Sequence, residues 1–270
     1  MKRFTGFDLA ALCLGLAFLY LPVLLVVLYS FNASKLVTVW GGFSLQWYAA
    51  LWQDEDLLDA AKLSLLTGAG AATLSTLLGT SAALDLAHGI SARGRLPGRQ
   101  IFAGVMLAPM VLPEVILGVS ILLLFVLLEA ERGGLTVMLA HATFGTAFAL
   151  VVIRAKLVTL DPDLEAAARD LGATPWGAFR YAVLPALAPS MAAAWLLAFT
   201  LSLDDLVIAS FVNGPGATTL PIKIYSSVRL GVTPEINAIA TLLIALVAII
   251  VGGAAWLQSR TAPPQKKLGC

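Results

Sequence analysis

The sequence predicts an all-α integral membrane protein with six transmembrane helices, on the basis of its composition, its long apolar runs and the placement of its basic residues. Hydrophobic residues make up 59% of the 270 residues, and charged residues make up only 12%. A soluble domain usually carries about 25% charged residues, so a soluble globular fold is excluded. We expect one membrane domain that covers residues 1–270.

The apolar runs have the length of membrane spans. A helix rises about 1.5 Å per residue, so about 20 apolar residues cross the ~30 Å hydrocarbon core of a bilayer. The first run continues to Phe31 without a small-residue cleavage site, which favours a retained span over a signal peptide. The predicted spans are at about 7–31, 61–87, 101–128, 135–159, 189–212 and 236–257.

The Lys and Arg residues indicate which side of the membrane each loop faces. With the N-terminus in the cytoplasm, twelve of them fall in or next to cytoplasmic segments and five fall on the other side. The twelve are Lys2, Arg3, Arg93, Arg95, Arg99, Arg154, Lys156, Arg169, Arg180, Arg260, Lys266 and Lys267, and the five are Lys35, Lys62, Arg132, Lys223 and Arg229. Because cytoplasmic loops carry an excess of Lys and Arg, we expect the N- and C-termini to be cytoplasmic.

The loop between the fourth and fifth spans, residues 161–188, is short, amphipathic and cytoplasmic in this topology. Its first part, Glu165–Leu171, has helix-forming composition with a small apolar face. Gly172 is placed to end that helix, because glycine tolerates the positive φ of a helix C-terminus. A helix of this size between two spans is expected to be a docking surface.

A second helix is expected to follow in the same loop. Thr174 is a suitable N-cap, and Pro175 fits the first turn, where its missing N–H costs nothing. Pro185 and Pro189 are expected to end this helix and to lead into the fifth span.

This loop resembles the EAA loop of ABC-importer permeases, whose consensus is EAA, three residues, Gly, nine residues, Ile, one residue and Leu-Pro. The matching or adjacent residues are Glu165, Ala166, Ala167, Ala168, Gly172, Leu184 and Pro185. The acid, Glu165, stands one place early, and Ala166 occupies the consensus Glu position. The resemblance implies that the loop couples the permease to an ATPase, and an ordinary amphipathic loop is the alternative.

Three acidic residues lie within apolar sequence. Glu114 follows Pro113 in the third span, and Asp204 and Asp205 lie in the fifth. An ionised side chain at bilayer depth costs several kcal/mol and normally faces a cavity or a partner. The basic residues of these spans lie at their ends, so either a cationic substrate or a proton would neutralise the acids. Alternatively, an aspartate caps a helix break, and Glu114 binds N–H groups freed by Pro113.

Aromatic residues gather in the segment after the first span, which is expected to be external. Trp40, Trp47 and Tyr48 are the candidates for a contact with a substrate or an external partner. The competing interpretation is an aromatic belt at the membrane interface, where Trp and Tyr are generally enriched.

Four longer stretches resemble the polyamine branch of the type I ABC-importer permeases. They are Tyr29–Tyr48, Pro109–Val115, Ser202–Pro221 and Ser226–Leu242, and the resemblance covers essentially the whole chain. It implies a permease of the bacterial inner membrane that carries putrescine or spermidine, with Glu114 and Asp204 or Asp205 on the translocation path. Charge counting cannot separate these two polyamines.

The resemblance also implies partners. They are a second permease subunit, two cytoplasmic ATPase subunits and a periplasmic polyamine-binding protein, within a lipid bilayer and without nucleic acid. The sequence contains no Gly-Lys pair and hence no P-loop. ATP and Mg²⁺ would therefore be bound by the ATPase subunits, and no cofactor or metal is expected in this chain.

Three other classes of protein compete with this interpretation. In a proton-coupled transporter the buried acids would relay protons, but the coupling-type loop and the lack of an obvious inverted repeat argue against it. For a membrane enzyme, the two histidines, His88 and His141, suggest no metal cluster and no Ser–His–acid arrangement. The third class is a permease for another solute, such as an amino acid or an oxyanion, but an anion path would require basic residues or half-helix N-termini rather than three acids.

Overall fold

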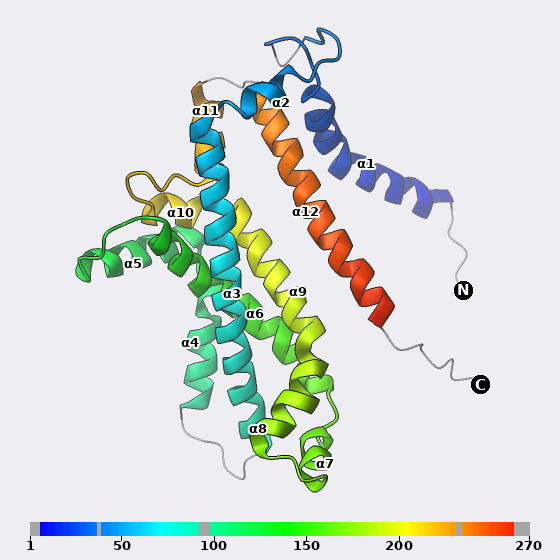
Figure 1. The fold of residues 1–270 in the computed structure, drawn as a ribbon, viewed down its shortest axis with the longest axis vertical. Coiled ribbons are helices and arrows are strands. Elements are labelled where there is room, and N and C mark those ends of the chain that lie inside the picture. Colours follow the sequence, from blue (N-terminus) through cyan, green and yellow to red (C-terminus); the bar gives the residue numbers. More distant parts are fainter. Residues whose placement is uncertain (1–5, 37–38, 92–97, 231–233, 262–270) are drawn as a thin grey trace. The chain divides into compact units, whose positions relative to one another are not determined.

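The computed structural model describes residues 6–36, 39–91, 98–230 and 234–261, and these residues are predominantly helical (Figure 1). Five of the described helices are long and apolar enough to cross a membrane, and the bent pair α4–α5 makes a sixth if it counts as one span. The helices are α1 (Gly6–Tyr29), α2 (Gln46–Leu51), α3 (Glu55–Ser91), α4 (Arg99–Val111), α5 (Glu114–Leu127), α6 (Gly134–Thr159), α7 (Leu164–Asp170), α8 (Pro175–Ala178), the π-helical segment η1 (Phe179–Val183), α9 (Leu184–Asp204), α10 (Val207–Val212), α11 (Leu220–Leu230) and α12 (Pro234–Thr261).

Part of the charge pattern used for the orientation lies outside the described residues. These positions are Lys2, Arg3, Arg93, Arg95, Lys266 and Lys267. The orientation of the termini therefore stays a prediction from the sequence.

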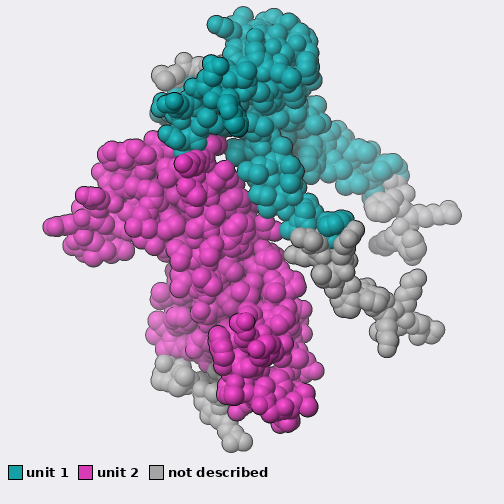
Figure 2. All heavy atoms as spheres, viewed as in Figure 1, with its two compact units in different colours: residues 1–59, 224–270 teal, residues 60–223 magenta. Residues whose placement is uncertain are grey.

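The chain divides into two compact units (Figure 2). The first comprises residues 1–59 and 224–270, and the second comprises residues 60–223. The boundaries fall within α3 and α11. All three candidate acids and the 161–188 loop belong to the second unit, whereas the candidate aromatic residues belong to the first.

In the first unit, α12 packs against α1 and α2. Apart from Asp8 in its first turn, helix α1 has no charged residue, and none of its residues is buried. The segment between α1 and α2 is organised by Asn32, which is fully buried. Its side-chain oxygen accepts the N–H groups of Ser34 and Gly41 at 3.2 and 2.7 Å, and its amide donates to the carbonyl of Val39 at 2.8 Å.

In the second unit, α6 lies at the centre and packs against α4, α5, α9 and α10. Small residues allow close approach. A side chain at Gly79 would come within 2.8 Å of Ala149, and one at Gly145 would come within 2.5 Å of Ser75 Oγ. Small residues are the usual device for close helix packing in a bilayer, where no hydrophobic force drives helices together.

The third predicted span, 101–128, is broken. Helix α4 ends at Val111, α5 begins at Glu114, and the two axes differ by 113°. Leu112 has φ −70° and ψ 141°, because the ring of a following proline disfavours the helical conformation in the residue before it. Pro109, by contrast, remains inside α4.

The expectation that Pro185 and Pro189 end the second loop helix is wrong. One helical run of 30 residues extends from Pro175 through both prolines to Asp204. It stays intact because η1 is wider than an α-helix, and the N–H of Leu184 bonds to the carbonyl of Phe179, five residues earlier. The wide turn leaves room for the proline ring, which would clash with a carbonyl four residues earlier in an α-helix.

The fifth predicted span, 189–212, is likewise not one helix. Helix α9 ends at Asp204, Asp205 is extended with ψ 122°, and α10 begins at Val207. The second unit therefore contains two breaks inside apolar sequence, and each is flanked by a carboxylate.

Candidate functional site

Glu114 and Asp204 lie at the two helix breaks of the second unit. Glu114 is the first residue of α5, Asp204 is the last residue of α9, and both are exposed in this chain. The helices that follow the two breaks, α5 and α10, pack against each other, so Glu114 and Asp204 belong to neighbouring helix breaks. The last carbonyls of α4 and α9 also lack helical partners, and a helix C-terminus carries a partial negative charge. The surroundings of Asp204 are therefore electronegative.

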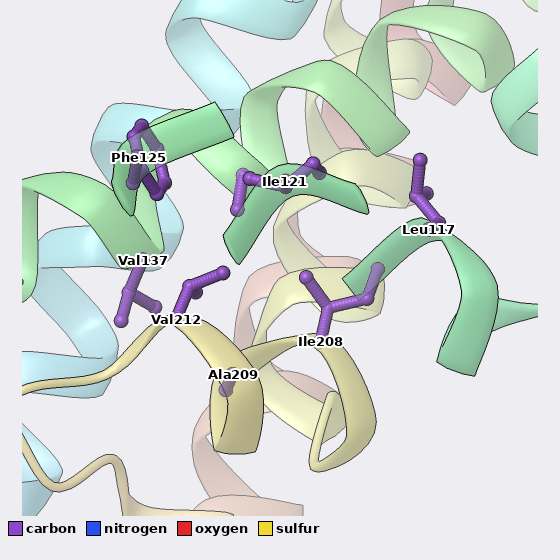
Figure 3. Packing of buried hydrophobic residues seen from close by; sticks show 8 residues of the cluster. Leu117, Ile121, Phe125, Val137, Ile208, Ala209 and Val212 are labelled. Carbon is purple, nitrogen blue, oxygen red and sulfur yellow. The ribbon is translucent and has the colours of Figure 1, made fainter. Parts of the chain in front are cut away.

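A hydrophobic cluster fixes both breaks relative to α6 (Figure 3). It contains residues of α5, α6 and α10, which are brought together although they are distant in the sequence. Its members are Leu117, Ile121, Phe125, Val137, Ala140, Ile208, Ala209 and Val212. The segments that follow the two breaks, α5 and α10, therefore form one packed body.

The carboxylate of Asp205 accepts hydrogen bonds from backbone N–H groups within the protein. Oδ2 accepts the N–H of Ala209 at 2.7 Å, and Oδ1 accepts the N–H of Ile208 at 3.3 Å. These N–H groups belong to the first turn of α10 and have no partner within that helix. The side chain is 7% exposed. The geometry thus favours the capping alternative for Asp205 and leaves Asp204 as the outward-facing aspartate.

His141, on α6, completes a buried chain of polar side chains. Its Nδ1 lies 2.6 Å from Ser202 Oγ, and its Nε2 lies 3.0 Å from Oδ2 of Asp205. The expectation that no Ser–His–acid arrangement forms is therefore wrong as a matter of geometry. However, Ser202 is 7% exposed and His141 is 4% exposed, so no substrate can reach the hydroxyl, and the arrangement serves the fold.

The sequence contains one signal for this buried set of polar side chains. A histidine inside an apolar span is a buried polar group, and such groups are almost always hydrogen-bonded. His141 therefore required partners, although the pattern along the chain did not say which residues they are.

The three candidate aromatic residues differ in their environment. Trp47 is 8% exposed, and its indole N–H donates to the carbonyl of Asn32 at 2.5 Å. The hydroxyl of Tyr48 lies 2.7 Å from Ser30 Oγ. Trp40 is 46% exposed and makes an edge contact with Tyr29. Trp47 and Tyr48 thus use their polar atoms within the first unit, whereas Trp40 keeps an accessible ring.

The 161–188 loop has most of the local structure that its sequence predicts. Helix α7 covers Leu164–Asp170, and Gly172 has φ +90° directly after it. The hydroxyl of Thr174 accepts the N–H of Gly177 at 3.1 Å, which confirms the predicted N-cap of α8.

One side of this loop is exposed and apolar. Leu171, Trp176 and Tyr181 are 90%, 68% and 78% exposed. Ala166 and Ala167 are also exposed, whereas Ala168 and Glu165 are half-buried.

The other side of the loop covers a cavity of about 520 Å³ between α7, η1 and the ends of α3 and α6. Glu165 and Asp161 line this cavity. The acid that stands one place early in the EAA pattern therefore faces the body of the unit rather than the exposed surface.

Comparison with known proteins identifies the family. Residues 75–262 match the family described as "Binding-protein-dependent transport system inner membrane component". The chain belongs to this family. It is thus the permease subunit of an ABC transporter in the inner membrane, and permease subunits do not themselves catalyse a reaction.

Named relatives cover nearly all of this permease. It is 52% identical over 268 residues to the "Putrescine transport system permease protein PotI" of Escherichia coli K12, covering 97% of this chain and 94% of that one. It is 39% identical over 235 residues to the "Spermidine/putrescine transport system permease protein PotC" of the same organism, covering 87% of each chain.

Solved structures support the fold of the permease. A subunit of a bacterial ABC transporter that imports alginate matches with a TM-score of 0.67, 18% identity and 94% coverage of both chains. The MetNI methionine transporter matches with a TM-score of 0.63 and 16% identity over 80% of this chain and 99% of that one. At these identities the likeness concerns the fold alone, and it confirms the predicted type I ABC permease architecture.

Proposed function

We propose that the permease forms half of the translocation path of an ATP-driven putrescine importer. The observation that carries the proposal is the pair of exposed carboxylates, Glu114 and Asp204, at two helix breaks whose following helices, α5 and α10, pack together. The 52% identity to PotI supports putrescine as the substrate. The complete importer would contain a second, PotH-like permease, two cytoplasmic ATPase subunits and a periplasmic polyamine-binding protein.

The charge of the site suits a cation. Within α4, α5, α9 and α10 the basic residue is Arg99, which lies at the opposite end of α4 and pairs with Asp85 at 3.8 Å. The carboxylates thus lack a basic partner on their own helices. Two separated carboxylates can bind the two ammonium groups of a diamine through charge-assisted hydrogen bonds. An anion would be repelled by the same arrangement.

The exposed side of the 161–188 loop suits an ATPase. Leu171, Trp176 and Tyr181 expose large apolar surfaces on the segment that resembles the EAA loop. The helical run Pro175–Asp204 begins at this surface and ends at a site carboxylate. With 30 residues at about 1.5 Å each, it spans roughly 45 Å. Movement of α8 on an ATPase would be transmitted along this helix to Asp204.

In the proposed cycle, closure of the ATPase pair tilts this helix and opens the path toward the loaded binding protein. Putrescine moves to Glu114 and Asp204 and is released into the cytoplasm after hydrolysis. The proposal keeps both termini in the cytoplasm, which the distribution of Lys and Arg favours. Trp40, with its accessible ring, is the aromatic candidate for a contact near the external entrance.

Spermidine is the second candidate substrate. The 39% identity to PotC, whose name includes both polyamines, favours it as the alternative. Spermidine carries one more amine than putrescine, so the partner permease would have to supply a further acceptor.

The experiment is the ATPase activity of the reconstituted complex, titrated with its binding protein loaded with putrescine, spermidine or an amino acid. We expect stimulation by the putrescine-loaded protein, weaker stimulation by the spermidine-loaded protein and none by the amino acid. Equal stimulation by the unloaded protein and all three loaded forms would contradict a polyamine-specific path.

A further inference from the structure

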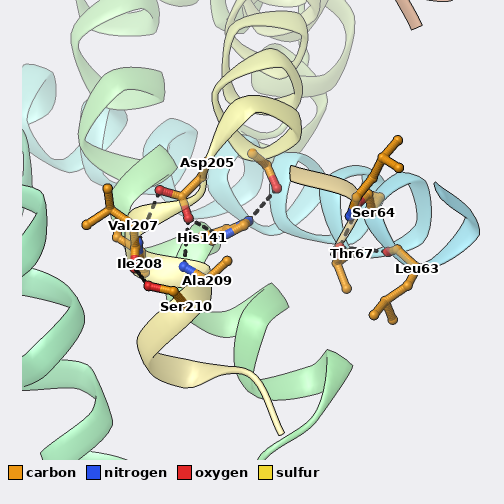
Figure 4. A network of polar contacts seen from close by, with 11 residues as sticks. Leu63, Ser64, Thr67, His141, Asp205, Val207, Ile208, Ala209 and Ser210 are labelled. Atoms are coloured by element: carbon orange, nitrogen blue, oxygen red, sulfur yellow. Dashed lines mark hydrogen bonds and ion pairs between the residues drawn. The ribbon is translucent and has the colours of Figure 1, made fainter. Parts of the chain in front are cut away.

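One buried side chain joins the two sides of the break between α9 and α10. His141 comes from a third helix, α6, and contacts Ser202 in the last turn of α9. It also contacts Asp205 at the break (Figure 4). Ser202 and Asp205 are 61 and 64 positions away from His141 in the sequence. The break therefore does not depend on its local sequence alone, because α6 holds both of its sides.

The hydrogen bonds among Ser202, His141 and Asp205 can all form at the same time. A neutral imidazole offers one donor and one acceptor. If Nε2–H donates to Asp205, then Nδ1 can accept the hydroxyl hydrogen of Ser202. Asp205 then holds three donors, namely His141 and the N–H groups of Ile208 and Ala209. A buried polar group without a partner would be strongly unfavourable, so this mutual pairing fixes the conformation of the break.

The break in turn determines what surrounds Asp204. If α9 continued into α10, the N–H groups of residues 205–208 would pair with the last carbonyls of α9. The electronegative helix end beside Asp204 would then disappear. With Asp205 extended, those carbonyls remain without helical partners, and Asp204 stays exposed as the final residue of α9.

We propose that His141 is a positioning residue for transport, which holds the α9–α10 break so that Asp204, rather than Asp205, presents its carboxylate beside Glu114. This inference rests on the proposed function of Asp204 as a ligand for the transported cation. His141 does not touch the cation and acts through Asp205. The buried Ser202–His141–Asp205 chain is thus a support for the site.

The test measures the accessibility of position 204 directly. In a chain whose native cysteines, Cys13 and Cys270, are replaced by serine, Asp204→Cys is introduced and the whole complex is purified. The rate of modification by a water-soluble, positively charged methanethiosulfonate reagent is then measured per assembled complex. This rate does not depend on the identity of the cargo.

Three variants of His141 and its surroundings are compared in that background. His141→Leu removes both hydrogen bonds at similar volume, whereas His141→Gln keeps a donor and an acceptor at similar spacing. Thr146→Val is the matched control, since Thr146 is also buried on α6 but its hydroxyl bonds only to the carbonyl of Ala142 in the same helix.

We expect His141→Leu to lower the modification rate at position 204 by about tenfold or more, because the lost hydrogen bonds to a charged group no longer hold the break that exposes this position. His141→Gln is expected to restore the rate to within about threefold of the parent, and Thr146→Val is expected to leave it unchanged. In the chain without Asp204→Cys, His141→Leu should lower the Vmax of putrescine uptake per complex and leave KM, which reflects capture by the binding protein, unchanged.

An assembled His141→Leu complex with an unchanged modification rate would overturn the proposal. If the complex with His141→Leu does not assemble, the same rate is measured in Ser202→Ala. This variant removes the hydrogen bond between Ser202 and His141 with little change in volume. A rate that Ser202→Ala does not lower would then overturn the proposal, and a lower rate would support it. Failure of the proposed function appears separately, as a lack of polyamine stimulation in the parent complex.

Discussion

Pro109 and Pro113 lie in the bent pair α4–α5, and Pro185 and Pro189 lie at the same spacing in the unbroken run that ends at Asp204. The two regions differ in the backbone conformation of the residue that precedes Pro113 in one region and Pro185 in the other. Leu112, before Pro113, is extended with ψ 141°, whereas Leu184, before Pro185, is helical with ψ −45°. A proline thus accompanies a break at Pro113 and is accommodated in a continuous helix at Pro185.

The reason lies in what precedes each proline. Before Pro185 the chain widens into η1, which takes up the proline ring without ending the helix. Before Pro113 there is no such wide turn, and Leu112 leaves the helical conformation, although Pro109 four residues earlier remains inside α4. The comparison suggests a division of roles in which the continuous helix transmits movement and the bent pair presents a carboxylate.

The largest expected effect comes from removing the charge of the carboxylates at the two helix breaks. Asp204→Asn and Glu114→Gln should each lower putrescine uptake by about tenfold to a hundredfold, because each removes a hydrogen bond between charged groups. Uptake is measured per assembled complex in proteoliposomes. Asp85→Asn is the control, since Asp85 is also an exposed acid but pairs with Arg99 at the far end of α4. Normal uptake in both site variants would remove the basis for a cation path.

The proposed coupling of the 161–188 loop to the ATPase is tested at Gly172. Gly172→Val places a β-branched residue at φ +90°, which costs about 1–3 kcal/mol and should shift α7 relative to α8. We expect ATPase stimulation by the loaded binding protein to fall by about tenfold while basal hydrolysis persists.

Gly172→Asn is the matched variant, because asparagine tolerates the left-handed region. Most of the stimulation should return in that variant. If valine and asparagine behaved alike, then backbone conformation at this position would not control coupling.

Local signals were sufficient for several of these features. The left-handed Gly172, the Thr174 cap and the break before Glu114 each follow from residues within a few positions of one another. Such features depend on backbone conformations that glycine permits, that a capping hydroxyl satisfies or that proline enforces. For this reason the sequence alone predicts the end of α7 at Gly172 and the N-cap at Thr174.

Features that depend on distant partners could not be predicted in the same way. The sequence is compatible with either role for Asp204 and Asp205, whereas the structure shows Asp205 bonded to α10 and to His141, which is 64 positions away. The π-helical segment η1 also gave no pattern that distinguishes Pro185 from a helix-ending proline. In both cases packing and hydrogen bonding determine which of two locally acceptable conformations forms.

The smallest expected effects come from changing one proline in each region. In Pro113→Ala, Leu112 is no longer barred from the helical conformation, so the joint loosens, although the packing of α5 on α10 still holds it. Uptake should fall by about fivefold, which corresponds to roughly 1 kcal/mol, with ATPase stimulation preserved.

In Pro185→Ala, the wide turn of η1 can relax to an α-helix. Because that turn holds one residue more than an α-helical turn, its relaxation rotates α8 by about 100° relative to α9. Stimulation should then fall by a similar factor together with uptake. If the two variants lost the same activity, the division between a presenting joint and a transmitting helix would be wrong.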